Sequence, residues 1–117
     1  MTEKEYDIEK RTYRFSLDLV NFSRKLPKTT ENVVFIRQVL RSGTSIGANI
    51  HEARGGASKK DFANFHSIVL KSTNETGYWL RLIKDTNQKL IEEADDLIDE
   101  VHQLSKIIAK ISINSRG

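Results

Sequence analysis

The chain has 117 residues, 38% of them hydrophobic and 30% charged, with one proline and no cysteine. This length suits one domain with one core, and the lack of cysteine excludes disulfides and thiolate metal sites. No stretch approaches the roughly 18 apolar residues of a membrane span, and the first residues lack the apolar core of a signal sequence. We therefore expect a helical, cytoplasmic, single-domain protein without membrane contact.

Positive charge is concentrated in the first half of the chain. Residues 1–60 carry 12 Lys and Arg against 7 Asp and Glu, residues 61–117 carry 7 against 9, and the net charge is +3. An excess of this size is compatible with nucleic-acid contact, but it is also ordinary for a small domain.

The first helix is predicted over residues 6–26. Pro27 ends it, because a proline disfavours the α conformation at the residue before it. Leu17 and Val20 widen its apolar stripe, as expected for a helix that touches two neighbours or a second subunit. The stripe itself recurs at alternating steps of four and three and consists of Ile8, Thr12, Phe15, Leu19, Phe22 and Leu26.

The second helix is predicted over residues 32–54, with Thr30 as its N-cap. Gly43 and Gly47 lie in its interior, where each glycine costs roughly 1 kcal/mol relative to alanine. We expect close approach of another helix to compensate for that cost. A polar line runs beside this small-residue strip and contains Arg41, Ser45, Asn49 and Glu52.

The third helix is predicted over residues 59–85, after a left-handed Gly55 and an N-cap at Ser58. The fourth is predicted over residues 91–113, and the acidic cluster at its start is explained by the helix dipole without a metal. Because each connection is short, the four helices predict an all-α, antiparallel up-and-down four-helix bundle. The core-facing line of the third helix is predicted as Phe62, Phe65, Val69, Ser72, Thr76, Trp79 and Ile83.

Polar residues fall near the apolar faces at mid-bundle. Burying an unpaired carboxylate in a core costs too much free energy, so we predict that Glu75 pairs with Arg41. We further predict that Ser45 and Asn49 complete the hydrogen bonds and that Glu52 belongs to the same buried network. In one interpretation this network sets the register between two helices. In the other it surrounds a binding site.

Enzymatic and metal-binding patterns are weak. The three histidines fall on three different helices without a second metal ligand at helical spacing. No nucleophile elbow or phosphate loop is present in its proper context. We therefore expect no catalytic residue, no metal and no cofactor.

The central part of the chain resembles a known family, the 23S rRNA intervening-sequence proteins. The resemblance rests on residues 41–50 (RSGTSIGANI), 52–53 (EA), 58–62 (SKKDF) and 75–82 (ETGYWLRL). It implies a four-helix bundle that assembles into a bacterial homopentamer. Some members are encoded within insertions in large-subunit rRNA genes, and a related branch is the accessory variability protein of diversity-generating retroelements.

Two functions remain open. The first is a non-catalytic, oligomeric protein that binds RNA or DNA, or serves as a ribonucleoprotein accessory protein associated with 23S rRNA intervening sequences. The second is a protein-interaction scaffold with no nucleic-acid role. More apolar surface than one bundle can bury also predicts self-association. The candidate nucleic-acid contacts are Arg37, Arg41, Arg54, Lys59, Lys60, Lys71, Arg81 and Lys84.

Overall fold

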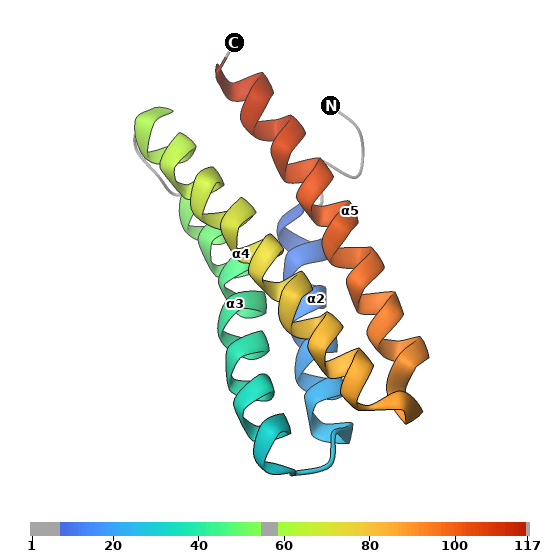
Figure 1. Ribbon diagram of the computed structural model, residues 1–117. Helices are drawn as coiled ribbons and strands as arrows, with labels where there is room; N and C mark the ends of the chain where they lie inside the picture. Colours follow the sequence, from blue (N-terminus) through green and yellow to red (C-terminus); the bar gives the residue numbers. More distant parts are fainter. Residues whose placement is uncertain (1–7, 55–58, 117) are drawn as a thin grey trace.

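The computed structural model describes residues 8–54 and 59–116, apart from the side chains of residues 54, 59–63 and 112–116. This part of the chain forms α2 (Ile8–Lys25), α3 (Thr30–Arg54), α4 (Lys59–Thr86) and α5 (Ile91–Arg116), with a short 3₁₀ helix, η1 (Gln88–Leu90), before α5. Figure 1 shows the four α-helices side by side, each antiparallel to the one before it. The predicted all-α, up-and-down bundle is therefore confirmed.

The helices form a closed ring of neighbours: α2 packs against α3, α3 against α4, α4 against α5, and α5 against α2. The α2–α5 seam is the sparsest, and Arg11 spans it. Its Nε and Nη2 atoms donate to the two carboxylate oxygens of Glu100, both at 2.8 Å, and Nη2 also donates to Gln103 Oε1 at 2.8 Å. This bidentate hydrogen bond raises the pKa of Arg11 above its ordinary value and outweighs the opposing effect of burial.

The core stripe predicted for the first helix is confirmed, because every one of its members is buried. The stripe predicted for the third helix needs correction. His66, Thr73 and Leu80 are buried, whereas the predicted Phe65, Ser72 and Trp79 are only partly buried. The physical reason is that α4 lies between α3 and α5 and buries the sides of the helix that face both. The side chain of the predicted Phe62 lies outside the described residues.

Helix ends follow local rules with small differences from the sequence expectation. As predicted, α2 ends before Pro27. The N-cap of α3 is Thr29 rather than Thr30, because the Asn32 backbone N–H donates to Thr29 Oγ1 at 3.1 Å. The other described ends lie within three residues of the expected ones. The predictions for Gly55 and Ser58 fall outside the described residues.

A reciprocal amide pair ties the two connections at one end of the bundle. Asn32 Nδ2 donates to Asn87 Oδ1 at 2.8 Å, and Asn87 Nδ2 donates to Asn32 Oδ1 at 3.0 Å. Asn32 also donates to the carbonyl of Pro27 at 2.9 Å. The buried Asn32 side chain thus has its hydrogen bonds satisfied. None of the described helices has the length and apolar character needed to cross a bilayer.

Candidate nucleic-acid interface

Hydroxyl pairs join α3 to α4 along their shared seam. Ser45 Oγ donates to Ser72 Oγ at 2.7 Å, and Thr76 Oγ1 donates to Ser42 Oγ at 2.9 Å. Thr76 Oγ1 also lies 2.7 Å from the carbonyl oxygen of Ser72 within α4, so the two acceptors share its single hydroxyl proton. Ser42 and Thr76 are almost fully buried. These small polar residues let the two helices approach closely while their hydroxyl groups remain hydrogen-bonded.

A charged cluster lies at the outer edge of the same seam. As predicted, Arg41 donates to Glu75 across the two helices. Gln38 Oε1 accepts from Arg41 Nε at 3.1 Å and from Nη2 at 2.8 Å. The indole N–H of Trp79 donates to Glu75 Oε2 at 3.1 Å. Glu75 therefore has partners on both helices.

These partners hold the pKa of Glu75 below its ordinary value. The largest cause is the hydrogen bond from Trp79, followed among the lowering effects by Arg41 and by the positive charge of Lys71, and together they outweigh desolvation. The Arg41 side chain is nevertheless 58% exposed. The cluster is thus a surface feature whose carboxylate stays ionised, and not the buried network that the sequence predicted.

Three members of that predicted network do not join Glu75 in the described part of the chain, and one of them, Ser45, pairs with Ser72 instead. Asn49 Nδ2 donates to the carbonyl of Ser45 within α3 at 2.7 Å, and no hydrogen bond joins Asn49 to Glu75 in the described part of the chain. Glu52 is exposed near the end of α3. Both residues lie further along α3 than Arg41, which is the α3 residue that pairs with Glu75. The spacings 38/41 and 75/79 are those of side-chain pairs on one helix face, so they could have identified Gln38 and Trp79.

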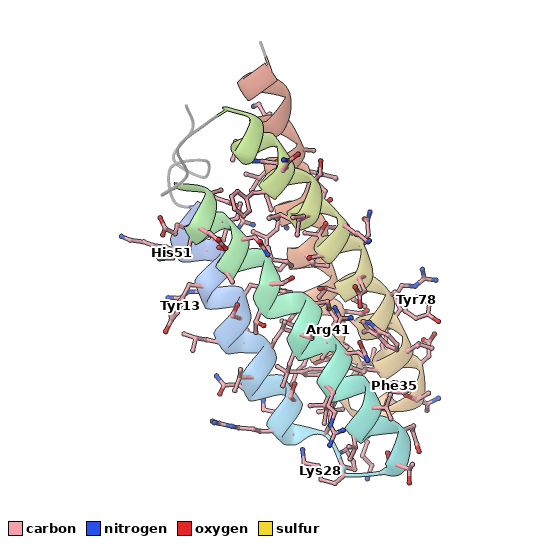
Figure 2. All side chains as sticks on the ribbon, turned by 90° about the vertical axis from the view of Figure 1, so that its left-hand side faces the viewer. Tyr13, Lys28, Phe35, Arg41, His51 and Tyr78 are labelled. Carbon is pink, nitrogen blue, oxygen red and sulfur yellow. The ribbon has the colours of Figure 1, made fainter. Side chains whose placement is uncertain are left out.

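Aromatic side chains extend the cluster over the surface of α4. Tyr78 packs against Trp79 with ring centroids 5.3 Å apart and an interplanar angle of 80°. Trp79 in turn faces Phe35 of α3, with centroids 6.2 Å apart. Figure 2 shows Phe35 and Arg41 on the side of α3 that faces α4, and Tyr78 at the outer edge of α4. The sequence interpretation placed Trp79 in the core and assigned no role to Tyr78.

The predicted basic contacts do not all remain available. Arg37, Arg41, Lys71 and Arg81 are exposed. Lys84 is only partly exposed and lies 2.6 Å from Asp95 of α5, so its charge is largely offset. We call the exposed residues Arg37, Arg41, Lys71 and Tyr78 the α3–α4 face. The side chains of Arg54, Lys59 and Lys60 lie outside the described residues.

A second surface lies on the other side of α3, between it and α2. There a groove of about 1170 Å³ is lined by apolar and small residues together with charged residues of α2, and His51 Nδ1 lies 2.7 Å from Glu9 Oε1. Tyr13 and Leu17 are 66% and 48% exposed in it. Figure 2 shows Tyr13 and His51 on the α2 side of α3. We define the α2–α3 groove by Tyr13, Leu17, Thr44, Gly47 and Ala48.

The predicted small-residue strip is used mainly inside the bundle. A Cβ atom added at Gly43 would overlap Leu19 Cδ1, and one at Gly47 would lie 3.3 Å from the backbone carbonyl group of Thr12. The expected close approach of another helix is thus confirmed, and that helix is α2 of the same chain. The apolar surface left for another partner is therefore smaller than the sequence indicated.

Groups that could hold a metal were sought in the described residues. No cluster of three or more His, Asp or Glu side chains is present among them. The acidic start of α5 instead contributes ion pairs to other helices: Glu93 lies 2.8 Å from Lys25, and Asp95 pairs with Lys84. Two acidic residues at the start of α5 are therefore used in ion pairs between helices.

Comparison with known proteins agrees with this fold. The family model described as 23S rRNA-intervening sequence protein matches residues 4–110. A crystal structure of a protein with unknown function from the S23 ribosomal protein family of Bacteroides thetaiotaomicron is 35% identical, with a TM-score of 0.84, over 93% of this chain and 97% of that chain. A search of curated proteins found no match. The chain therefore belongs to the 23S rRNA-intervening sequence protein family.

Proposed function

We propose that this protein is a non-catalytic, self-associating RNA-binding protein that acts as an accessory component of a ribonucleoprotein. The observation that carries the proposal is the α3–α4 face, where the exposed cations Arg37, Arg41 and Lys71 lie on the same two helices as the exposed Tyr78. Cations contact phosphates and aromatic rings contact bases, so this combination suits nucleic acid better than an acidic protein surface.

The family gives the proposal its choice of nucleic acid. Its description names an intervening sequence of 23S rRNA, and we carry that association to this chain as RNA binding. Glu75 offsets one positive charge of the face, so we expect micromolar binding that weakens strongly with salt, and not a tight complex.

A titration of labelled RNA tests the proposal. The probes are a structured RNA with a single-stranded loop and duplex DNA, each at 50 and 200 mM salt. The double variant Arg37→Glu with Lys71→Glu should weaken RNA binding at least tenfold and lower the salt slope by about one or two. The matched control is Lys89→Glu with Lys106→Glu, which makes the same charge change at exposed positions of η1 and α5. Its decrease in log affinity for RNA should be less than half of the decrease in the Arg37→Glu with Lys71→Glu variant.

The outcomes separate the function classes. Equal losses in both double variants would mean that net charge, and not the α3–α4 face, governs binding. Tighter binding of duplex DNA than of RNA would overturn the choice of RNA. No binding at 50 mM salt would refute the RNA function and favour a protein-interaction scaffold, which a pull-down of partners would then address.

Self-association is assigned to the α2–α3 groove. Tyr13 and Leu17 expose two large apolar side chains in the same groove, which is typical of an interface. Thr44, Gly47 and Ala48 provide a small-residue surface beside them. A second copy of the chain can cover these apolar side chains. We expect a pentamer, the number that the family resemblance implies.

Sedimentation velocity at micromolar concentration measures the assembly. Wild-type protein should sediment at about five times the 13.4 kDa chain mass. Tyr13→Glu with Leu17→Glu should yield smaller species, because it places two charges in the contact. Tyr78→Glu, on the α3–α4 face, is the control and should leave the assembly intact. A wild-type monomer would contradict the proposed self-association.

A further inference from the structure

Tyr78 offers an open aromatic surface in a cationic setting. Its side chain is 57% exposed although it packs against Trp79. The two rings are nearly perpendicular, with an interplanar angle of 80°. In such an edge-to-face pair each contact uses one ring edge and one ring face. Whichever ring supplies the edge, Trp79 leaves at least one face of Tyr78 uncovered.

The ring that supports Tyr78 is held in place from two directions. The Trp79 N–H donates to Glu75 at 3.1 Å, and the indole packs against Phe35 of α3. Tyr78 therefore rests on a side chain that is fixed at the α3–α4 seam. A fixed aromatic surface loses little conformational freedom when a flat ligand stacks on it, which favours binding.

Positive charge lies about one to two helical turns from Tyr78 along α4. Lys71 precedes Tyr78 by seven residues, or two helical turns, and is exposed on α4. Arg41 is oriented by Gln38 and Glu75 through its Nε and Nη2 atoms. Its Nη1 atom makes no hydrogen bond to the described residues. One oriented guanidinium and one lysine are thus available to phosphate groups near the ring.

We propose that Tyr78 stacks an unpaired base of single-stranded RNA, while Arg41 and Lys71 contact the phosphates beside that base. This inference rests on the proposed RNA-binding function and specifies its ligand. Bases in a duplex are already paired and stacked and cannot lie on a protein side chain, whereas unpaired bases can. The α3–α4 face should therefore prefer loops and single strands to duplexes.

The other exposed tyrosine of the described surface lies in a different setting. Tyr13 shares the α2–α3 groove with the carboxylates of Glu9 and Asp18 as well as with Lys10 and Arg14. Mixed charge of this kind does not favour a polyanion. The difference assigns base stacking to Tyr78 and self-association to Tyr13.

The experiment compares an unstructured 12-nucleotide RNA with a duplex of the same sequence by fluorescence anisotropy of the labelled RNA. Tyr78→Ala and Tyr78→Leu should each weaken single-strand binding about tenfold and duplex binding less than twofold, since one stacked base is lost. Tyr78→Phe keeps the ring and should stay within about twofold of wild type. Ile68→Ala removes exposed apolar surface from the same helix and should change neither affinity.

A second readout uses Trp79, the only tryptophan in the chain. Single-stranded RNA should alter its fluorescence in wild type and Tyr78→Phe, because a base bound to Tyr78 lies close to the indole. Thermal unfolding followed by circular dichroism verifies that each variant is folded. Since Tyr78 is largely exposed, we expect midpoints close to that of wild type.

The results distinguish failure of the inference from failure of the function. Wild-type affinity in Tyr78→Leu, or equal losses for single strand and duplex, overturns base stacking. In that case RNA binding itself still stands if Arg37→Glu with Lys71→Glu weakens it. A wild-type protein that binds neither RNA refutes both proposals. A changed sedimentation coefficient in Tyr78→Ala would mean that Tyr78 contacts another subunit, which also overturns base stacking.

Discussion

Helix α3 packs against its two neighbours, α2 and α4, through different interactions. Towards α2 it presents Gly43 and Gly47, which admit the Leu19 side chain and the backbone of Thr12 into close contact. Towards α4 it presents Ser42 and Ser45, whose hydroxyl groups pair with hydroxyl groups of α4. The α2–α3 seam depends on the absence of a side chain at the two glycines, and the α3–α4 seam depends on paired hydroxyl groups.

This difference determines what each seam tolerates. At the α2–α3 seam an added methyl group meets atoms that are already packed, so volume is the sensitive quantity. At the α3–α4 seam the sensitive quantity is pairing, because a buried hydroxyl that loses its partner is penalised more than a pair that is removed together. Substitutions on the two sides of α3 should therefore behave differently.

The largest expected effect is at the glycine seam. Gly43→Val should lower the free energy of unfolding by about 2–3 kcal/mol, because its branched side chain overlaps the buried Leu19. Urea denaturation measures the change. Gly43→Val combined with Leu19→Ala should be less destabilised than the sum of the two single variants, since the second change opens space for the first. Strict additivity would contradict the proposed overlap.

At the hydroxyl seam the expected loss is smaller and can be compensated. Thr76→Val should lower stability by about 1 kcal/mol, because Ser42 loses the hydrogen bond from Thr76 at 2.9 Å. Adding Ser42→Ala should recover much of that loss by removing the hydroxyl left without its partner. The double-mutant cycle is measured by chemical denaturation. A double variant that is as unstable as the sum of the singles would count against a paired interaction.

Gly77, the third described glycine inside a helix, differs from Gly43 and Gly47 because there is room for a side chain beside it. A Cβ atom at Gly77 would lie 4.0 Å from Val101 Cγ1, an ordinary contact distance. Gly77→Ala should therefore stabilise the protein by about 0.5–1 kcal/mol through higher helix propensity. The thermal unfolding midpoint should rise. A fall would mean that α4 and α5 pack more tightly at this position than the contact distance indicates.

The smallest effect is the pH dependence of the Arg41–Glu75 cluster. The pKa of Glu75 is lowered in the folded state by Trp79 and Arg41. The ionised carboxylate therefore contributes stability above the ordinary carboxyl pKa, and this contribution is lost as the pH falls through the lowered value. The effect is modest because the pair is exposed.

Glu75→Gln isolates that contribution. The difference in unfolding midpoint between wild type and Glu75→Gln should be largest at pH 7 and should shrink as the pH falls below about 4. Glu92→Gln, an exposed carboxylate at the start of α5, is the control. A difference that grows on acidification would contradict the lowered pKa.

The candidate site was only partly predictable. The contact between Arg41 and Glu75 followed from the need to pair a carboxylate placed near an apolar face. The role of Trp79 could not be predicted in this way. A tryptophan at bundle spacing is typical of a core residue, and the direction of its N–H depends on the rotation of α4 about its axis. The same rotation explains why His66 and Leu80 are buried although the predicted stripe passed beside them.

By itself, the sequence determined the helical elements and their order. Helices and their ends depend on residues that are close in sequence, such as the periodic apolar residues, Pro27 and the short connections. They can therefore be predicted without knowing which helix packs against which. Tertiary structure decided which neighbour fills the space above Gly43 and Gly47, and which apolar residues remain outside the core at Tyr13 and Leu17. It also decided the placement of Tyr78 beside a fixed Trp79. The reason is that burial and side-chain pairing depend on the rotation of each helix relative to two others, a quantity that no single helix encodes.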